Sequence, residues 1–132
     1  MLIEEVMTSV DKLVLISPMG TVRSTLELMK KNDIRSVIVD KSSQSGAYGL
    51  ITFENVLESI VAEDGDIDLL NVYDIATIPA FSVSAKLDTQ YAAKMMVNSK
   101  IKRLLVVDNN ELLGILTITD IIGSLMESIE EI

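Results

Sequence analysis

The chain contains an internal repeat, and this feature constrains its fold more than any other. In both copies an apolar run that ends in aspartate precedes a glycine, a second apolar run and a threonine. Repetition of this kind means that one small structural unit is built twice along the chain. The matched segments are 33–40 with 101–108, 49–56 with 114–121 and, more loosely, 6–8 with 72–74 and 16–18 with 83–85.

Each copy has the hydrophobic pattern of a β-α-β-β-α unit. Apolar runs rich in Val, Ile and Leu predict strands that are buried on both faces, and apolar residues at helical spacing predict the helices. Asp88 is a candidate N-cap of the first helix in the second copy. The predicted strands are 13–16, 36–39, 48–52, 80–83, 104–107 and 112–117, and the predicted helices are 21–32, 54–63, 88–99 and 120–131.

One such unit buries too little surface to be stable alone. We therefore predict an α+β fold in which two β-α-β-β-α modules, 1–66 and 67–132, pack sheet to sheet with pseudo-twofold symmetry. The core should be aliphatic, because aromatic residues make up only 4% of the chain. Methionines at helical spacing are interpreted as core residues, namely Met29, Met95, Met96 and Met126.

The composition excludes several classes of function. The chain has no cysteine and no histidine, which rules out disulfides, thiolate or imidazole zinc sites and histidine-based catalysis. A net charge of −9 argues against binding to nucleic acid or to anionic membranes. No secretory signal and no apolar run of roughly 20 residues is present, so we expect a soluble, cytoplasmic protein.

An enzyme is not expected. The chain has no glycine-rich phosphate loop of the Walker type. The carboxylates Glu54, Asp64, Asp66 and Asp68 have the chemistry to bind magnesium, but residues 64–68 have the pattern of a solvated loop.

Polar side chains lie where the last strand pattern changes to a helix pattern. Thr117, Thr119 and Asp120 have two interpretations. They hold a small polar ligand, or they only cap the helix, since a short side-chain oxygen there accepts a free backbone N–H. An ionised carboxylate offers two acceptor oxygens to the hydroxyls of a ribose, which favours the ligand interpretation.

The arginines of the two copies also have two interpretations. A guanidinium binds phosphate through its planar fork of donors. The alternative is a salt bridge at the strand ends, from Arg35 or Arg103 to Asp40 or Asp108.

The Gly-Ile-Leu-Thr-Ile-Thr-Asp-Ile run that closes a β-α-β-β-α unit resembles a CBS (cystathionine β-synthase) module. The whole chain, from about Val6 to Met126, resembles a tandem pair of such modules, also called a Bateman module. One departure is Ala85, which stands where the family commonly has proline. The resemblance implies a regulatory, non-catalytic module that senses AMP, ADP or ATP in a cleft between the copies and acts on an unidentified partner. An S-adenosylmethionine-binding module is an alternative, and magnesium is an optional companion of a nucleotide.

The resemblance also implies roles for individual residues. Asp120 accepts hydrogen bonds from the ribose, and the threonines before it serve ribose or phosphate. Basic residues approach the phosphates, and residues of the other copy's first segment surround the adenine. The residues assigned in this way are Asp120, Thr117, Thr119, Lys102, Arg103, Arg35 (by symmetry), Met7, Thr8 and Leu13.

The first copy is expected to bind more weakly. Asn55 stands where the second copy has Asp120, and it carries no charge. Glu54 would repel a phosphate there. Thr52 and Asn55 therefore form the weaker second site.

The last helix suggests a homodimer. Its apolar residues are more than one core normally needs, although their complete burial within the monomer is the alternative. These residues are Ile121, Ile122, Leu125, Met126 and Ile129. A scaffold or dimerisation protein without any ligand is the competing function.

Overall fold

The structure is a computed structural model, and it describes residues 1–130, with side chains to Ile129. The chain forms two compact units. One consists of Leu13–Ala80, and the other combines Met1–Lys12 with the chain from Phe81 onward. The second unit is therefore built from both ends of the described chain.

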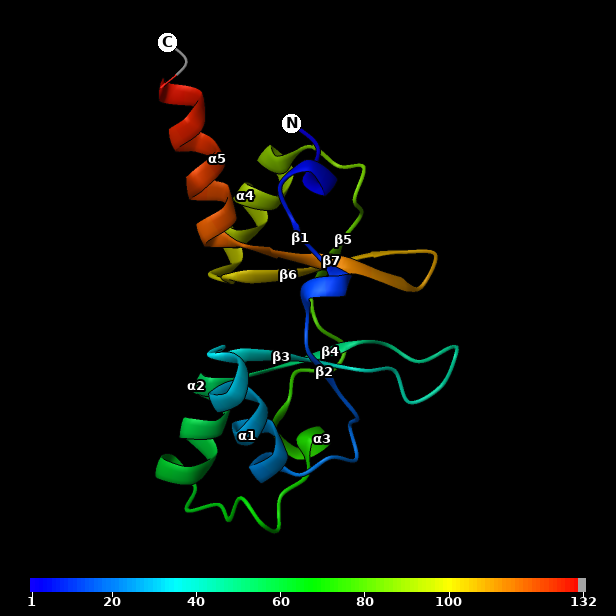
Figure 1. The fold of residues 1–132 in the computed structure, drawn as a ribbon, viewed down its shortest axis with the longest axis vertical. Helices are drawn as coiled ribbons and strands as arrows, with labels where there is room; N and C mark the ends of the chain where they lie inside the picture. The colour runs from blue at the N-terminus through cyan, green and yellow to red at the C-terminus, as the bar shows by residue number, and fades with distance from the viewer. Residues whose placement is uncertain (131–132) are drawn as a thin grey trace. The chain divides into compact units, whose positions relative to one another are not determined.

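The unit Leu13–Ala80 has a three-stranded sheet in the order β2-β3-β4. Strands β2 and β3 are parallel, whereas β3 and β4 form an antiparallel pair. The helices of this unit cover one face of the sheet (Figure 1). Its elements are β2 (Leu15–Ile16), α1 (Val22–Asn32), β3 (Ser36–Val39), β4 (Gly49–Thr52), α2 (Phe53–Leu57), which continues as the π-helical turn η3 (Glu58–Ala62), and α3 (Val72–Ile75).

The other unit has a four-stranded sheet in the order β1-β7-β6-β5. Strand β1 comes from the start of the chain and pairs antiparallel with β7. The helices α4 and α5 lie on one face of the sheet (Figure 1). The elements are the 3-10 helices η1 (Ile3–Glu5) and η2 (Val10–Lys12), the strands β1 (Thr8–Ser9), β5 (Ser82–Val83), β6 (Arg103–Asp108) and β7 (Glu111–Thr117), and the helices α4 (Thr89–Ser99) and α5 (Ile118–Glu130).

Side-chain caps set where α1 and α4 begin. The Ser24 amide donates to Thr21 Oγ1 over 3.0 Å, and the Gln90 amide donates to Asp88 Oδ1 over 2.9 Å. Each bond satisfies one of the free N–H groups of a first helical turn. The predicted N-cap at Asp88 is therefore confirmed.

Each unit has its own aliphatic core, and the α+β fold class is confirmed. The two cores are centred on β3 and β6, where Val37–Val39 and Leu104–Val106 are buried, as predicted for these strands. Met29 and Met96 are also buried, and Met95 packs against the core. The prediction for Met126 is wrong, because its side chain is 59% exposed on α5.

The first segments of the repeats pair differently from the sequence match. Thr8 lies opposite Ile115, and Thr77 lies opposite Leu50. Leu50 and Ile115 are matched positions of the repeat, so Thr8 corresponds to Thr77 and not to Asp74. The match of 6–8 with 72–74 is therefore wrong, because short segments with little apolar periodicity do not fix their own register. The match of 16–18 with 83–85 is confirmed, since Ile16 pairs with Val39 as Val83 pairs with Val106.

Candidate functional site

Thr117 and Asp120 form a reciprocal pair at the start of α5. The Asp120 amide donates to Thr117 Oγ1 over 3.2 Å, and the Thr117 amide donates to Asp120 Oδ2 over 2.8 Å. This is a capping box, so the helix-capping interpretation holds, with Thr117 rather than Thr119 as the cap. Within the part of the chain that the structure describes, the other carboxylate oxygen of Asp120 has no hydrogen-bond partner. It remains able to accept a bond from a ligand.

A hollow of about 500 Å³ lies beside the first turns of α5. Its volume is within the range of about 300–1,000 Å³ that small-molecule sites occupy. Three of its residues carry carboxylates, so the hollow favours hydrogen-bond donors and positive charge over phosphate. The residues that line it are Met1, Glu5, Val6, Thr119, Asp120, Gly123, Ser124 and Glu127.

Arg103 lies directly opposite Thr117 in the β6–β7 ladder. Residues that face each other in a ladder point to the same side of the sheet. The neighbouring Leu104 belongs to the core beneath the helices, so Arg103 and Thr117 point away from α4 and α5. Lys102 is exposed, and its carbonyl accepts a 2.9 Å bond from the Ile118 amide.

Arg35 is not the counterpart of Arg103. Its carbonyl accepts a 2.9 Å bond from the Phe53 amide, which is the role of Lys102 in the other unit. Ser36 lies opposite Thr52 and so takes the place of Arg103. The expected symmetry of the two arginines is therefore wrong, because Arg35 lies one position before the residue that corresponds to Arg103. A shift of one position along a strand turns the side chain to the opposite face of the sheet.

Met7 and Thr8 lie against β7, in the same unit as Asp120. A methyl group at Gly114 would overlap the Thr8 carbonyl oxygen and come within 2.9 Å of Met7 Sδ. Glycine is therefore required at Gly114 for this close approach. Leu13, which was assigned with Met7 and Thr8, belongs to the other compact unit.

The unit Leu13–Ala80 has the same capping geometry at the start of α2, with Asn55 in the place of Asp120. The Asn55 amide N–H donates to Thr52 Oγ1 over 3.1 Å, and the Thr52 amide donates to Asn55 Oδ1 over 2.9 Å. The single side-chain oxygen of Asn55 is therefore engaged, whereas Asp120 keeps a second oxygen. This difference agrees in direction with the predicted weaker site.

The aspartates at the strand ends bond backbone amides instead of arginines. Asp40 Oδ1 accepts from the Lys41 amide over 2.8 Å, and Asp108 Oδ2 accepts from the Ala85 amide over 3.1 Å. Among the described residues neither carboxylate forms an ion pair with Arg35 or Arg103. The salt-bridge interpretation of these arginines is therefore wrong.

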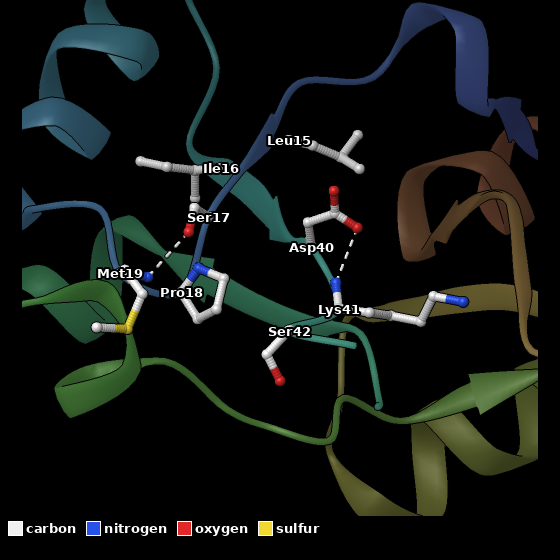
Figure 2. Close-up of a pocket in the computed structure, with 8 residues that line it drawn as sticks. All are labelled: Leu15, Ile16, Ser17, Pro18, Met19, Asp40, Lys41 and Ser42. Carbon is white, nitrogen blue, oxygen red and sulfur yellow. Dashed lines mark hydrogen bonds between the residues drawn. The ribbon is translucent and has the colours of Figure 1, made fainter. Parts of the chain in front are cut away.

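A second hollow, of about 310 Å³, lies where the parallel strands β2 and β3 end. Figure 2 shows the Asp40–Lys41 bond there and the bond from the Met19 amide to Ser17 Oγ, which measures 3.1 Å. The sequence analysis missed this hollow, although adjacent parallel strands commonly leave a crevice at their carboxyl ends. Its residues are Leu15, Ile16, Ser17, Pro18, Met19, Asp40, Lys41 and Ser42.

The described residues hold neither a metal-binding cluster nor a membrane-spanning helix. Residues 1–130 contain no group of three or more acidic side chains arranged to hold a metal ion. They also contain no helix with the length and apolarity needed to cross a membrane.

Comparison with known proteins identifies relatives over nearly the whole chain. The family model described as CBS domain matches residues 3–62 and 72–127. An uncharacterized protein of Methanopyrus kandleri is 30% identical over 107 residues, which cover 80% of this chain and 54% of that protein. This chain thus spans about half the length of that relative.

Solved structures have the same fold. A hexameric CBS-CP12 protein from bloom-forming cyanobacteria has 29% identity and a TM-score of 0.83, with 92% of this chain and 69% of that chain covered. CBSX2, solved in complex with AMP, has 21% identity and a TM-score of 0.78, with 96% of each chain covered.

Proposed function

This chain belongs to the CBS-domain family, and from that premise we propose that it is a regulatory module that binds an adenosine compound beside Asp120. The module would act on a partner protein through the difference in ligand affinity between two states. The AMP complex of CBSX2 supports an adenine nucleotide as the ligand, at the level of a shared fold.

The proposal depends on the position and the free hydrogen-bonding capacity of the Asp120 carboxylate. Thr117 fixes it in place, one of its oxygens has no partner among the described residues, and it borders a hollow of about 500 Å³. The two hydroxyls of a ribose are donors that an ionised carboxylate can accept, and such charge-assisted bonds are about twice as strong as neutral ones.

The phosphates of AMP, ADP or ATP would lie toward Arg103 and not within the hollow. Glu5 and Glu127 line the hollow together with Asp120, and their carboxylates repel phosphate. Arg103 points to the same side of the sheet as Thr117, which supports its guanidinium as the group that binds the phosphates. Magnesium would be a companion of the phosphates and not a resident metal.

The acidity of the hollow favours a second candidate ligand, S-adenosylmethionine. This compound carries its positive charges next to an adenosine and has no phosphate. Glu5, Asp120 and Glu127 would attract it where they would repel ATP.

A thermal-shift titration with AMP, ATP and S-adenosylmethionine tests the proposal. A ligand at 100 times its Kd stabilises the protein by about 2.7 kcal/mol, which is a clear rise in Tm. A response that disappears in Asp120→Asn supports the site. A flat response to all three compounds would contradict the proposal and favour a scaffold protein.

We also propose that α5 carries a homodimer interface. Four apolar side chains of α5 are half or more exposed: Ile122 (50%), Leu125 (61%), Met126 (59%) and Ile129 (62%). Of the five apolar residues, only Ile121 packs on the core of its own unit. Contiguous apolar surface of this kind marks interaction sites. The hexameric state of the CBS-CP12 relative supports association of copies.

A further inference from the structure

A third hollow, of about 250 Å³, lies between α1 and the start of α2 in the unit Leu13–Ala80. Met29 is buried in its floor, and the three other apolar residues are half-buried against the core. We call this surface the basic hollow, and it is lined by Leu26, Met29, Lys30, Ile34, Arg35 and Phe53. It therefore joins an apolar floor to two cationic side chains.

The two cations of the basic hollow are available to a partner. Lys30 and Arg35 are both exposed, and within the described part of the chain neither has an ion-pair partner. Lys31 adds a third positive charge next to them on α1. In a chain of net charge −9, residues 26–35 carry three cations against the two carboxylates of Glu27 and Asp33, so the charge beside this apolar surface is positive.

The second module provides an internal control. The helices α1 and α4 have the same length and the same left-handed C-cap, so Leu26 corresponds to Ala93 and Lys30 to Val97. Because α4 forms with Ala93 and Val97, the larger apolar residue and the cation on α1 are not required by the repeated fold. Their presence in the first module needs another reason.

We propose that the basic hollow docks an acidic peptide segment of a partner protein, with one large apolar side chain inserted as the anchor. A buried anchor side chain is how a peptide fills an apolar surface hollow of this kind. The thioether of Met29 can adapt to the shape of the anchor. Arg35 can bind a flanking carboxylate through two parallel hydrogen bonds.

This inference rests on the proposed function only because a regulatory module needs a partner protein. The proposed peptide contacts do not involve Thr117, Asp120 or Arg103. The two proposals therefore fail independently, and each has its own measurement.

The test is a nuclear magnetic resonance titration of the full chain with the synthetic peptide Glu-Glu-Asp-Glu-Phe-Glu-Asp-Glu-Glu. The expected result is a set of shifts centred on Leu26, Met29 and Phe53 that weakens with salt. Replacing the peptide's Phe by Ala should remove the shifts. The double variant K30E/R35E should weaken binding by roughly tenfold or more.

The matched control is Lys94→Glu, which makes on α4 the same change of charge that Lys30→Glu alone makes on α1, and it should leave peptide binding unchanged. Three results would overturn the inference: no shifts at millimolar peptide, equal loss in Lys94→Glu, or shifts produced by sodium decanoate and not by the peptide. The last would assign the basic hollow to an anionic amphiphile. Peptide binding without any Tm response to adenosine compounds would overturn only the adenosine site.

Discussion

Thr117 and Asp120 bond to each other's backbone amides, over 3.2 Å and 2.8 Å, at the point where β7 becomes α5. The same carboxylate is therefore a structural part of the helix start and the proposed ribose acceptor. Any substitution of Asp120 changes both the stability of α5 and the affinity for a ligand, and a test must separate the two effects.

Asp120→Asn separates them better than Asp120→Ala. The asparagine retains an oxygen for the Thr117 amide, as Asn55 does for Thr52, but it loses the charge and the second acceptor oxygen. We expect Asp120→Asn to lower adenosine-compound affinity by about 1.5–3 kcal/mol, the value of a hydrogen bond to a charged group. Calorimetric titration with AMP gives the affinity, and thermal unfolding gives the stability.

The control for this prediction is Asn55→Ala in the first module. It should remove the hydrogen bond from the Thr52 amide and destabilise the protein by about 0.5–1.5 kcal/mol, while the tight adenosine site is unaffected. Equal affinity of wild type and Asp120→Asn would remove Asp120 from the site. Two equally tight sites in the wild type would contradict the predicted difference between Asp120 and Asn55.

Gly114→Ala should destabilise the protein by about 1–3 kcal/mol, because the added methyl group overlaps the Thr8 carbonyl and contacts Met7 Sδ. Strand β1 would have to move away from β7, so hydrogen exchange in β1 should speed up. Gly123→Ala is the matched substitution, since no atom lies within 4 Å of its added methyl group. It should stabilise α5 by about 0.5–1 kcal/mol. Equal effects on Tm would contradict the close approach of β1.

Leu125→Glu combined with Ile129→Glu should convert a homodimer to a folded monomer. These side chains are 61% and 62% exposed on α5, so the charges are tolerated in the monomer but not when buried in an interface. Analytical ultracentrifugation measures the state. Val97→Glu on α4, also at an exposed apolar position, is the control and should leave the dimer intact. A monomeric wild type would refute the interface.

The Arg23–Asp68 ion pair should make stability depend on pH. Arg23 donates from Nε to Asp68 Oδ1 and from its Nη2 to Oδ2 over 2.9 Å, which ties α1 to the loop before α3. The hydrogen bond from Arg23 lowers the pKa of Asp68 below its ordinary value of about 3.9. Because the folded pKa is the lower one, the pair's contribution is present above that ordinary value and is lost as the pH falls through the folded pKa.

Comparison of wild type with Asp68→Asn isolates this effect. The wild type should have the higher Tm near neutral pH, and the difference should close as the pH falls below about 4. Both side chains are more than half exposed, so the difference should be small and should shrink in high salt. Glu111→Gln, on an exposed residue with no ion pair among the described residues, should show no such closing difference.

The sequence predicted the elements well where local chemistry sets their limits. Asp88 caps α4 as predicted, and Thr21, the first residue of the predicted helix 21–32, is the cap of α1. The β3–β4 and β6–β7 pairs lie where the apolar runs indicate. The interpretation of Thr117, Thr119 and Asp120 as helix-capping residues depended on the same local chemistry, and it holds for Thr117 and Asp120 but not for Thr119. Caps and hairpins involve neighbours in sequence, so a sequence pattern can determine them.

The failures involve properties that need long-range contacts. The continuous apolar runs of β3 and β6 have no alternation, so the sequence did not reveal that Arg35 matches Lys102 rather than Arg103. Met126 has helical spacing, but which side of α5 meets the core depends on packing with α4 and β7. The basic hollow combines residues from α1, from the segment just before β3 and from α2, and no local pattern indicates it.

The pairing of β1 with β7 has a consequence for dissecting the protein. A gene fragment that stops after the first repeat would encode one whole sheet and an orphaned leading strand, while the complementary fragment would lack that strand. To isolate the half that carries Asp120, residues 1–12 would have to be fused behind α5 as a circular permutant. Such a permutant would show whether the half that carries Asp120 folds without the other.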